Sequence, residues 1–274
     1  MEDGCMKKIA RITTQKRNKE RYNIFISEDD KEYYGFSVNE AILIQYALRK
    51  GMELPDNVLE DLLQQNTLYE AYTRAIHYLS YRMRTKKEIR DHLIKKEVEP
   101  MQADEVLARL EEEKLTDDLE FAKMFVRTRI NTSDKGPGYI KRELLGKGVT
   151  EQIISKALEL YTFGDQLEKA LQFTMKKNRQ QVRESHTQKK QRIQAALMQR
   201  GFSTDVIKEA IAELEEEKNE DIELEAMQQQ ADKLLRKHGR THEGYKLKQK
   251  LKEGLYRKGF SMDAIRNYLD NELE

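Results

Sequence analysis

The chain has little of what disulfides, membrane spans and helix breaks require. Its 274 residues include a single cysteine, Cys5, so no internal disulfide can form. No apolar run approaches the ~20 residues of a membrane helix, and the basic residues near the start flank no apolar core of a signal peptide. Only three prolines are present, so long helices meet few breaks. These absences predict a cytoplasmic protein that is rich in helix and does not enter a membrane.

Residues in catalytic or metal-binding spacings are also scarce. His238 and His242 stand four apart, as two ligands on a helix would, but Gly239 lies between them and no third ligand is near. The glycine segments 136–138 and 146–148 follow no strand and lack the G-K-S/T sequence of a phosphate-binding loop. Paired carboxylates occur within helical charge runs, where no pocket can be inferred. We therefore expect no enzymatic activity, no bound metal and no cofactor.

One helical pattern is written four times along the chain. Its clearest copy, I-x-x-x-L-x-x-x-G-V-x-x-x-x-I-x-x-x-L, runs from Ile140 to Leu158. The anchoring leucines of the four copies lie 51, 53 and 58 residues apart. A period near 50 residues is typical of stacked helical units, each too small to bury a core alone. The two anchoring positions of the copies are Ile89 and Leu93, Ile140 and Leu144, Ile193 and Leu197, and Leu251 and Leu255.

Each copy is expected to contain three helices. A glycine, Gly148, Gly201 or Gly259, follows three of the second helices, where a left-handed residue commonly ends a helix. Glu97 stands there in the first copy, so its turn is expected to differ. Thr150, Ser203 and Ser261 occupy N-cap positions of third helices. The second helices are expected at 85–96, 139–147, 188–200 and 245–258, and the third at 101–113, 151–161, 204–217 and 262–273.

The first ~50 residues have a strand-like rather than a helical pattern at their start. Three short runs, 8–14, 21–27 and 32–36, are rich in β-branched and aromatic residues, and Asp29-Asp30 predicts a turn. Ser37 and Glu40 form a capping box for a helix that ends at Gly51, and Pro55 precedes another helix at 56–65. The fold class is therefore mainly α, an elongated array of tandem three-helix repeats with a small N-terminal β-sheet plus helix domain. We expect this domain at 1–66 and the repeats at 67–114, 115–163, 164–218 and 219–274.

The net charge of +1 hides a segregation between helices. The second helices contain eighteen Lys and Arg against four Asp and Glu, whereas the third helices, extended to Glu274, contain seventeen acidic residues against four basic ones. One charge run is usually a solvated face, but a fourfold recurrence predicts a basic stripe along one side of the array. The helix pairs resemble a helix-turn-helix, yet phosphates would repel the acidic second member, which argues against operator recognition.

The candidate binding residues are cations of the first three repeats and one tyrosine. Guanidinium groups form bidentate hydrogen bonds with carboxylates and phosphates alike, so the basic stripe suits an acidic protein surface, nucleic acid, or both. In the second repeat, Gly136-Pro137-Gly138 predicts a tight loop beside these cations. Aromatic residues are expected mainly in core registers, which leaves few platforms for stacked bases. The basic stripe comprises Arg82, Arg84, Lys86, Lys87, Arg127, Arg129, Lys135, Tyr139, Lys141, Arg142, Lys147, Lys189, Lys190 and Arg192.

Two motifs in the first two repeats are specific. One is D-x-x-F-A-x-x-x-V-x-x-R from Asp118 to Arg129, followed by G-P-x-x-I-x-x-E-L-x-x-K-G-V. The other is A-x-x-Y-L-S-x-R-x-R-T-x-x-E-I from Ala75 to Ile89. Both resemble motifs of the RecX family, the regulators of the RecA recombinase, and the likeness extends from about Tyr72 to the C-terminus. The resemblance implies tandem three-helix units and a non-enzymatic role in DNA repair. It also implies lodging in the groove of the RecA–DNA filament.

The resemblance further implies modulation, mostly inhibition, of the filament's ATPase, strand-exchange and coprotease activities. The implied partners are the RecA filament and single- and double-stranded DNA bound without sequence preference, and the chain is expected to act as a monomer. The residues themselves leave another function open, a free-standing, non-specific DNA-binding protein that uses the basic stripe. Affinity for DNA measured with and without RecA and nucleotide would separate these two functions.

Overall fold

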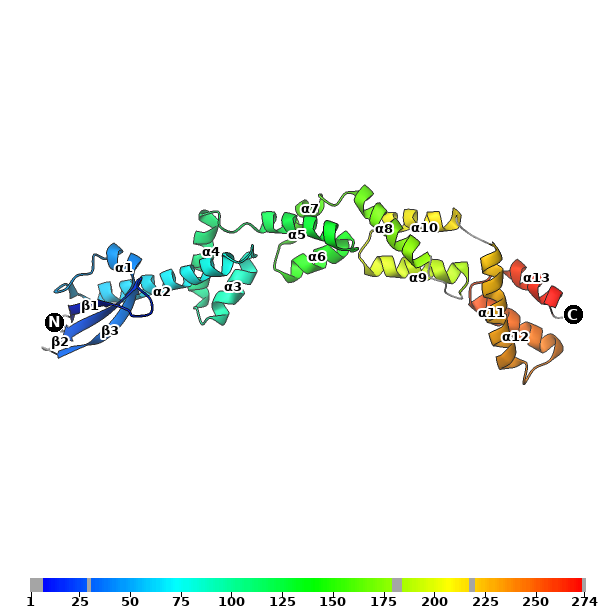
Figure 1. The fold of residues 1–274 in the computed structure, drawn as a ribbon, viewed down its shortest axis with the longest axis horizontal. Coiled ribbons are helices and arrows are strands. Elements are labelled where there is room, and N and C mark those ends of the chain that lie inside the picture. The colour runs from blue at the N-terminus through cyan, green and yellow to red at the C-terminus, as the bar shows by residue number, and fades with distance from the viewer. Residues whose placement is uncertain (1–6, 29–30, 179–183, 217–219, 273–274) are drawn as a thin grey trace. The chain divides into compact units, whose positions relative to one another are not determined.

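The computed structural model describes residues 7–28, 31–178, 184–216 and 220–272. It divides into an N-terminal unit, Met1–Phe121, and a C-terminal unit, Ala122–Glu274. The described residues form thirteen helices and four strands, which confirms the mainly helical fold class (Figure 1). Cys5, the Asp29-Asp30 turn and Glu217, the expected end of a third helix, lie outside the described residues.

The N-terminal unit begins with an antiparallel sheet in the order β3-β2-β1-β4. The strands are β1 (Lys7–Thr14), β2 (Arg21–Glu28), β3 (Lys31–Asn39) and β4 (Glu53–Leu54). Alternate residues of β2 and β3, among them Ile24 and Val38, are fully buried. They share a core with Ile42 of α1 (Glu40–Gln45) and Leu62 of α2 (Asp56–Leu79). The predicted small sheet domain is therefore present, and two helices complete its core.

The capping box predicted at Ser37 is absent, because strand pairing uses that backbone. Ser37 lies in β3 opposite Asn23, and its hydroxyl accepts a hydrogen bond from Arg21 Nε at 3.0 Å. Asn39 is the N-cap instead, since its side chain accepts from the backbone N–H of Ala41. The helix also ends at Gln45, before the expected end at Lys50.

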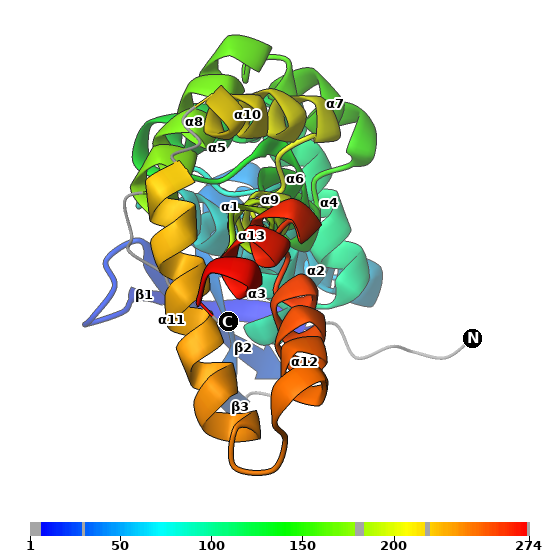
Figure 2. The same cartoon turned by 90° about the vertical axis from the view of Figure 1, so that its right-hand side faces the viewer.

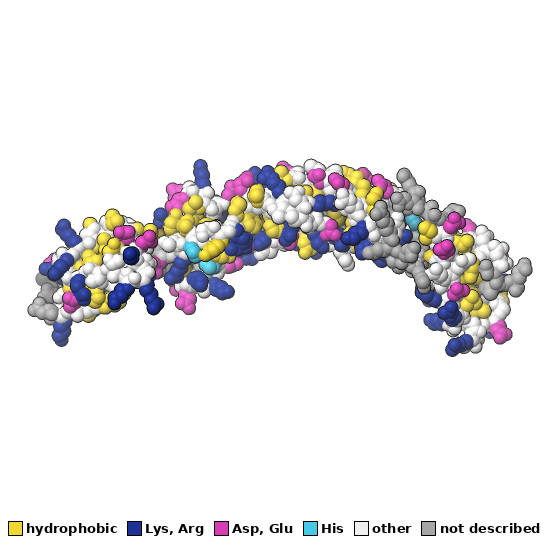
Figure 3. Space-filling model, viewed as in Figure 1, with side chains coloured by type: hydrophobic (Ala, Val, Ile, Leu, Met, Phe, Trp, Pro, Cys, Tyr) yellow, Lys and Arg dark blue, Asp and Glu magenta, His cyan; other side chains and the backbone are white. Residues whose placement is uncertain are grey.

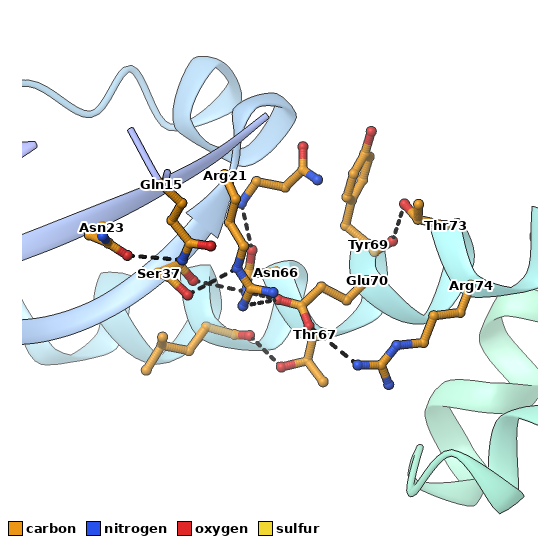
Figure 4. A network of polar contacts seen from close by, with 12 residues as sticks. Gln15, Arg21, Asn23, Ser37, Asn66, Thr67, Tyr69, Glu70, Thr73 and Arg74 are labelled. Atoms are coloured by element: carbon orange, nitrogen blue, oxygen red, sulfur yellow. Dashed lines mark hydrogen bonds and ion pairs between the residues drawn. The ribbon is translucent and has the colours of Figure 1, made fainter. Parts of the chain in front are cut away.

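The helix predicted to end at Gln65 continues to Leu79 as α2. Asn66, in its middle, is only 6% exposed. Its amide oxygen accepts from the backbone N–H of Asn39 at 3.0 Å, and its amide nitrogen donates to the Ser37 carbonyl at 3.3 Å (Figure 4). The sheet thus satisfies a side chain that would otherwise compete with helix formation. The boundary expected between residues 66 and 67 lies inside this one helix.

Each repeat packs three helices around the predicted apolar frame. All eight anchoring residues have 0% exposed surface, which confirms the frame as core. The fourth repeat shows the arrangement, with two long helices side by side and the shorter third helix against them (Figure 2). After α2 the helices are α3 (Lys86–Lys95), α4 (Pro100–Glu112), α5 (Asp118–Thr132), α6 (Pro137–Gly146), α7 (Glu151–Leu158), α8 (Phe163–Asn178), α9 (His186–Gln199), α10 (Thr204–Glu216), α11 (Glu220–His238), α12 (Gly244–Arg257) and α13 (Met262–Glu272).

All four second helices end in the same turn, so the different turn predicted at Glu97 is wrong. Glu97 has φ 63°, close to the 81° of Gly148 and the 82° of Gly201 and Gly259. The next N–H, that of Val98 in the first repeat, donates to the carbonyl of the anchoring leucine five residues earlier, at 3.1–3.3 Å in the four repeats. This 6→1 hydrogen bond defines a Schellman turn.

All three predicted N-cap positions of the third helices are confirmed, and two of the three residues also cap with their side chains. The hydroxyl of Ser203 accepts from the backbone N–H of Val206 at 3.4 Å, and that of Ser261 accepts from Ala264 at 3.2 Å. Thr150 occupies the N-cap of α7 with extended backbone, but its side chain makes no capping hydrogen bond.

Replacing Glu97 with glycine is expected to stabilise the first repeat. A left-handed conformation costs an L-residue about 1–2 kcal/mol, whereas glycine adds about 0.5–1 kcal/mol of chain entropy on folding. The free energy of unfolding measured with urea should therefore rise by roughly 0.5–1 kcal/mol. Glu105→Gly, an equal change of charge at an exposed position inside α4, should lower it by about 1 kcal/mol. A loss of stability in Glu97→Gly would contradict the claim that the left-handed backbone strains Glu97.

Consecutive repeats of the C-terminal unit meet at what we call a seam. There, the start of one repeat's second helix contacts the Schellman turn of the next repeat. In the first seam, Gly136 N–H donates to the Arg200 carbonyl and Gly138 N–H to the Gly201 carbonyl, both at 2.8 Å. In the second seam, the Ser185 hydroxyl donates to the Lys258 carbonyl.

The segment Gly136-Pro137-Gly138 is therefore part of a helix start rather than the predicted loop. Gly136 is the N-cap of α6, and Pro137 is its first residue, where a missing N–H does no harm. A Cβ on Gly136 would lie 2.6 Å from the backbone of Gly201. The two glycines thus allow two repeats to approach backbone to backbone.

Candidate binding surface

Most residues of the basic stripe lie on the second helices and on the segments that lead into them, whereas Arg127 and Arg129 lie on α5, the first helix of the second repeat. Figure 3 shows Lys and Arg side chains along the lower edge of the C-terminal unit, below α6 and α9, and acidic side chains nearer its upper edge. The contacts of the individual side chains divide the predicted residues into those held in ion pairs and those open to a partner.

In the first repeat, two of the four predicted cations are in ion pairs. Arg82 lies 3.3 Å from Glu88, and Lys86 Nζ lies 2.5 Å from Glu111 of α4. The Arg84 guanidinium stacks 4.2 Å from the ring centroid of Tyr78 and is half-buried. Lys87 is exposed and forms no ion pair within the described part of the chain. Lys87 is thus the cation most open to a partner in this repeat.

The second repeat contains a half-buried ion pair. Arg129 Nη2 lies 2.6 Å from Glu143 Oε1, with about a third of the arginine side chain exposed. The same guanidinium lies 4.9 Å from the ring centroid of Phe125. Lys141 pairs with Glu151 of α7 at 3.1 Å. These contacts give Arg129 and Lys141 structural roles that the sequence did not indicate.

Two arginines of the second repeat are exposed. Arg127 contacts only the sulfur of Met124, at 3.9 Å, and Arg142 donates a 3.4 Å hydrogen bond to the Gln199 carbonyl. Neither is in an ion pair among the residues that the structure describes. Tyr139 lies between two cations, with Lys135 Nζ 4.7 Å and the Arg142 guanidinium 5.5 Å from its ring centroid.

The remaining predicted cations are partly engaged. Lys147 lies 5.9 Å from the Phe125 ring centroid, and Lys189 donates to the Asn178 side chain at 3.0 Å. Arg192 makes hydrogen bonds of 2.6 and 3.0 Å to Glu184, whose side chain is only 12% exposed. Lys190 is half-buried on α9.

The segregation of charge has a structural component. Ion pairs that join a second helix to the third helix of the same repeat include Lys86–Glu111, Arg90–Asp104 and Lys141–Glu151. The hydrogen bond from Arg90 lowers the pKa of the Asp104 carboxyl below its ordinary value. Opposite charge on adjacent helices therefore helps to align them, although each exposed pair contributes at most about 1 kcal/mol. The cations left for a partner are fewer than the sequence predicts.

Exposed aromatic rings are more numerous than expected. Tyr81 is 71% exposed, Tyr245 82% and Tyr256 60%. Tyr81 lies just beyond the end of α2, and Tyr245 and Tyr256 lie on α12. None of the three occupies an anchoring position of the repeat, and this could have indicated from the sequence that their rings are exposed. The structure therefore offers stacking platforms that we did not predict.

Two further properties concern the described residues only. None of their helices combines the length and the apolar character that a membrane span requires. They also contain no cluster of three potential metal ligands. His238 and His242 stand edge to face, with ring centroids 6.1 Å apart.

Family models match most of the chain. The model of the regulatory protein RecX N-terminal domain matches residues 7–55. The models of the RecX first and second three-helix domains match 71–110 and 117–158. The model of the RecX third three-helix domain matches twice, at 164–211 and 221–269.

Relatives named regulatory protein RecX cover nearly the whole chain. That of Oceanobacillus iheyensis is 49% identical over 98% of this chain and 99% of its own. That of Bacillus cytotoxicus is 41% identical over 97% and 98%. A crystal structure of regulatory protein RecX, 36% identical, has a TM-score of 0.65 and covers 74% of this chain and 97% of that one. RecX from Lactobacillus salivarius, also 36% identical, has a TM-score of 0.53 over 55% and 98%. The chain therefore belongs to the RecX family of regulatory proteins.

Proposed function

We propose that this protein binds the filament of the RecA recombinase on DNA and slows its ATP turnover, strand exchange and coprotease activity, without hydrolysing ATP itself. The observation that supports this most is the recurrence of one turn and one kind of seam from repeat to repeat. A helical filament presents the same site again and again. Repeated units joined in the same way suit such a partner, because each can meet an equivalent site.

Several weak contacts made together would give the binding its strength. A second contact in a linked array becomes intramolecular, which raises overall affinity by about 10²–10⁴ without any new kind of interaction. Lys87, Arg127 and Arg142 are exposed cations suited to acidic side chains or to DNA phosphates in the filament groove. Repeats of the C-terminal unit, which are joined by seams, would resist the subunit rotations of a hydrolysis cycle. In this proposal, the rigidity of the bound protein inhibits the filament, and no reaction catalysed by the protein is required.

A titration of RecA's DNA-dependent ATPase with this protein tests the proposal. We expect turnover to fall and the inhibition to saturate well below one molecule per RecA subunit, because each molecule spans several subunits. Inhibition should weaken as salt rises from about 50 to 200 mM, since charged contacts are screened. RecA activity that stays unchanged at micromolar excess would refute the proposal.

The second candidate function is free-standing, non-specific DNA binding. The exposed tyrosines favour it, since bases stack on such rings. Affinity for single-stranded DNA measured with and without RecA and nucleotide separates the two functions. A large increase with RecA supports filament regulation, and equal affinity supports the second function.

A further inference from the structure

A pocket of about 520 Å³ lies in the first repeat, between the last turns of α2 and the end of α3. Its volume is within the range of small-molecule sites. The described residues that line it include two tyrosines, two histidines, one arginine and one lysine, with no carboxylate among them. None of the six belongs to the basic stripe. They are Arg74, His77, Tyr78, Tyr81, His92 and Lys96.

Two of the lining residues, Tyr78 and His92, form a pair of stacked rings. The rings of Tyr78 and His92 lie parallel, with an interplanar angle of 1° and centroids 3.9 Å apart. The Arg84 guanidinium lies 4.2 Å from the Tyr78 ring centroid. Burial lowers the pKa of His92, and Lys96, Arg84 and Lys95 lower it further. Both effects favour the neutral imidazole of His92, whose flat ring lies parallel to that of Tyr78 in the pocket lining.

The ring of Tyr81, another lining residue, is exposed to solvent. The Tyr81 hydroxyl is hydrogen-bonded to His77 Nε2 at 3.1 Å, and the two rings stand edge to face with centroids 5.2 Å apart. Tyr81 is nevertheless 71% exposed. The ring is oriented by this hydrogen bond and not by burial. Its face is therefore accessible and already oriented before a ligand binds. Such a preorganised ring loses little entropy when a flat ligand stacks on it.

The pocket lining also includes two cationic side chains, Arg74 and Lys96. Lys96 is exposed, and the polar contacts of Arg74 with other described residues are long, 3.4 Å to the Lys96 carbonyl and 3.8 Å to Glu70. Glu70 is engaged more closely elsewhere, by Arg21 at 2.6 Å and by the Asn66 amide at 3.1 Å (Figure 4). The Arg74 guanidinium is therefore loosely held and can turn toward an anion. The pocket offers flat aromatic faces together with two cations.

We propose that this pocket binds one nucleotide of a single-stranded nucleic acid, with the base on the face of Tyr81 and the phosphate between Arg74 and Lys96. Stacking on a tyrosine accepts every base, since each has a flat π-face, and the cations add phosphate contacts without base preference. The ligand would thus be a strand of any sequence. This inference rests on the second candidate function and deepens it, because it assigns one contact with the strand to the pocket and requires no contact with RecA.

Histidine resonances provide a local test. The chain has five histidines, and two of them, His77 and His92, line the pocket. In full-length protein with ¹³C-labelled histidine, oligothymidylate of four nucleotides should shift the imidazole signals of His77 and His92. Binding that leaves both signals in place would overturn the proposal. Equal shifts with inorganic phosphate would reduce the site to an anion site, and equal shifts with thymidine monophosphate at the same concentration would exclude the strand as ligand.

Variants of Tyr81 test the stacking itself. Tyr81→Ala should weaken binding of the oligonucleotide about fivefold or more in fluorescence anisotropy, whereas Tyr81→Phe, which keeps the ring but loses the hydrogen bond to His77, should weaken it less. The matched control is Tyr34→Ala, which removes a 54% exposed ring from β3 and should change nothing. A strand with abasic sites should bind wild type and Tyr81→Ala equally. Unchanged affinity in Tyr81→Ala, or an equal loss for the abasic strand, would refute base stacking.

Discussion

Gly201→Ala should destabilise the C-terminal unit by about 3 kcal/mol or more. At φ +82° an L-residue is strained by about 1–2 kcal/mol. The added Cβ would also lie 2.2 Å from the backbone nitrogen of Tyr139 and 2.8 Å from the carbonyl carbon of Gly138. These are backbone atoms, so relief requires opening the first seam and losing the hydrogen bond from Gly138. Urea unfolding would measure the loss, and faster amide exchange at Gly136 and Gly138 would locate it.

Gly51→Ala is the matched control for this prediction. Gly51 has nearly the same dihedral angle, φ +83°, but a Cβ there would have no neighbour within 4 Å. Only the conformational strain should appear, about 1 kcal/mol, in the unfolding of the N-terminal unit. The difference between the two variants isolates the contribution of backbone contact at the seam. Equal losses would mean that the seam tolerates a side chain, contrary to the structure.

The second large effect is expected from reversing two exposed cations. Arg127→Glu combined with Arg142→Glu should raise the concentration for half-inhibition of RecA's ATPase by at least about tenfold, because each reversal replaces an attraction with a repulsion. Neither arginine is in an ion pair in the described residues, so stability should change by no more than about 0.5 kcal/mol per site. Arg129 and Lys141 are unsuitable for this test, since both pair with glutamates.

Glu105→Lys combined with Glu112→Lys is the corresponding control on an acidic third helix. Both glutamates are exposed on α4, and neither is ion-paired in the described part of the chain. This variant shifts net charge by the same amount in the opposite direction, so it should inhibit RecA as well as the wild type. Loss of inhibition in this variant, with inhibition kept by the double arginine variant, would place the binding surface on the acidic helices.

The repeats could be predicted from sequence because their signal is local. Residues such as Ile140 and Leu144 lie one helical turn apart on one face, and the structure buries both completely. The turn at Glu97 was mispredicted because the residue type argued against a left-handed backbone. The hydrogen bond from Val98 to the Leu93 carbonyl and the burial of Val98 impose that backbone nevertheless.

The features that sequence analysis missed depend on distant partners. Ser37 has a capping sequence, but its strand pairs with β2. Asn66 disfavours a helix until the sheet supplies partners for its amide. At the candidate site, the contact between Lys86 and Glu111 spans two helices, and periodicity gives no ion-pair distances.

The form of the seam bears on how such a chain changes length during evolution. Each seam needs only the start of one second helix and the Schellman turn of the next repeat, so a gene segment that encodes one repeat carries both halves of a joint. Duplicating that segment in frame would create a new joint without altering the old ones. The RecX third three-helix domain matches both 164–211 and 221–269, as a copied segment would. The turn residues of the two joints, Gly201 and Gly259, are both glycines with φ 82°, whereas the helix starts that meet them differ, with Gly136 in the first joint and Ser185 in the second.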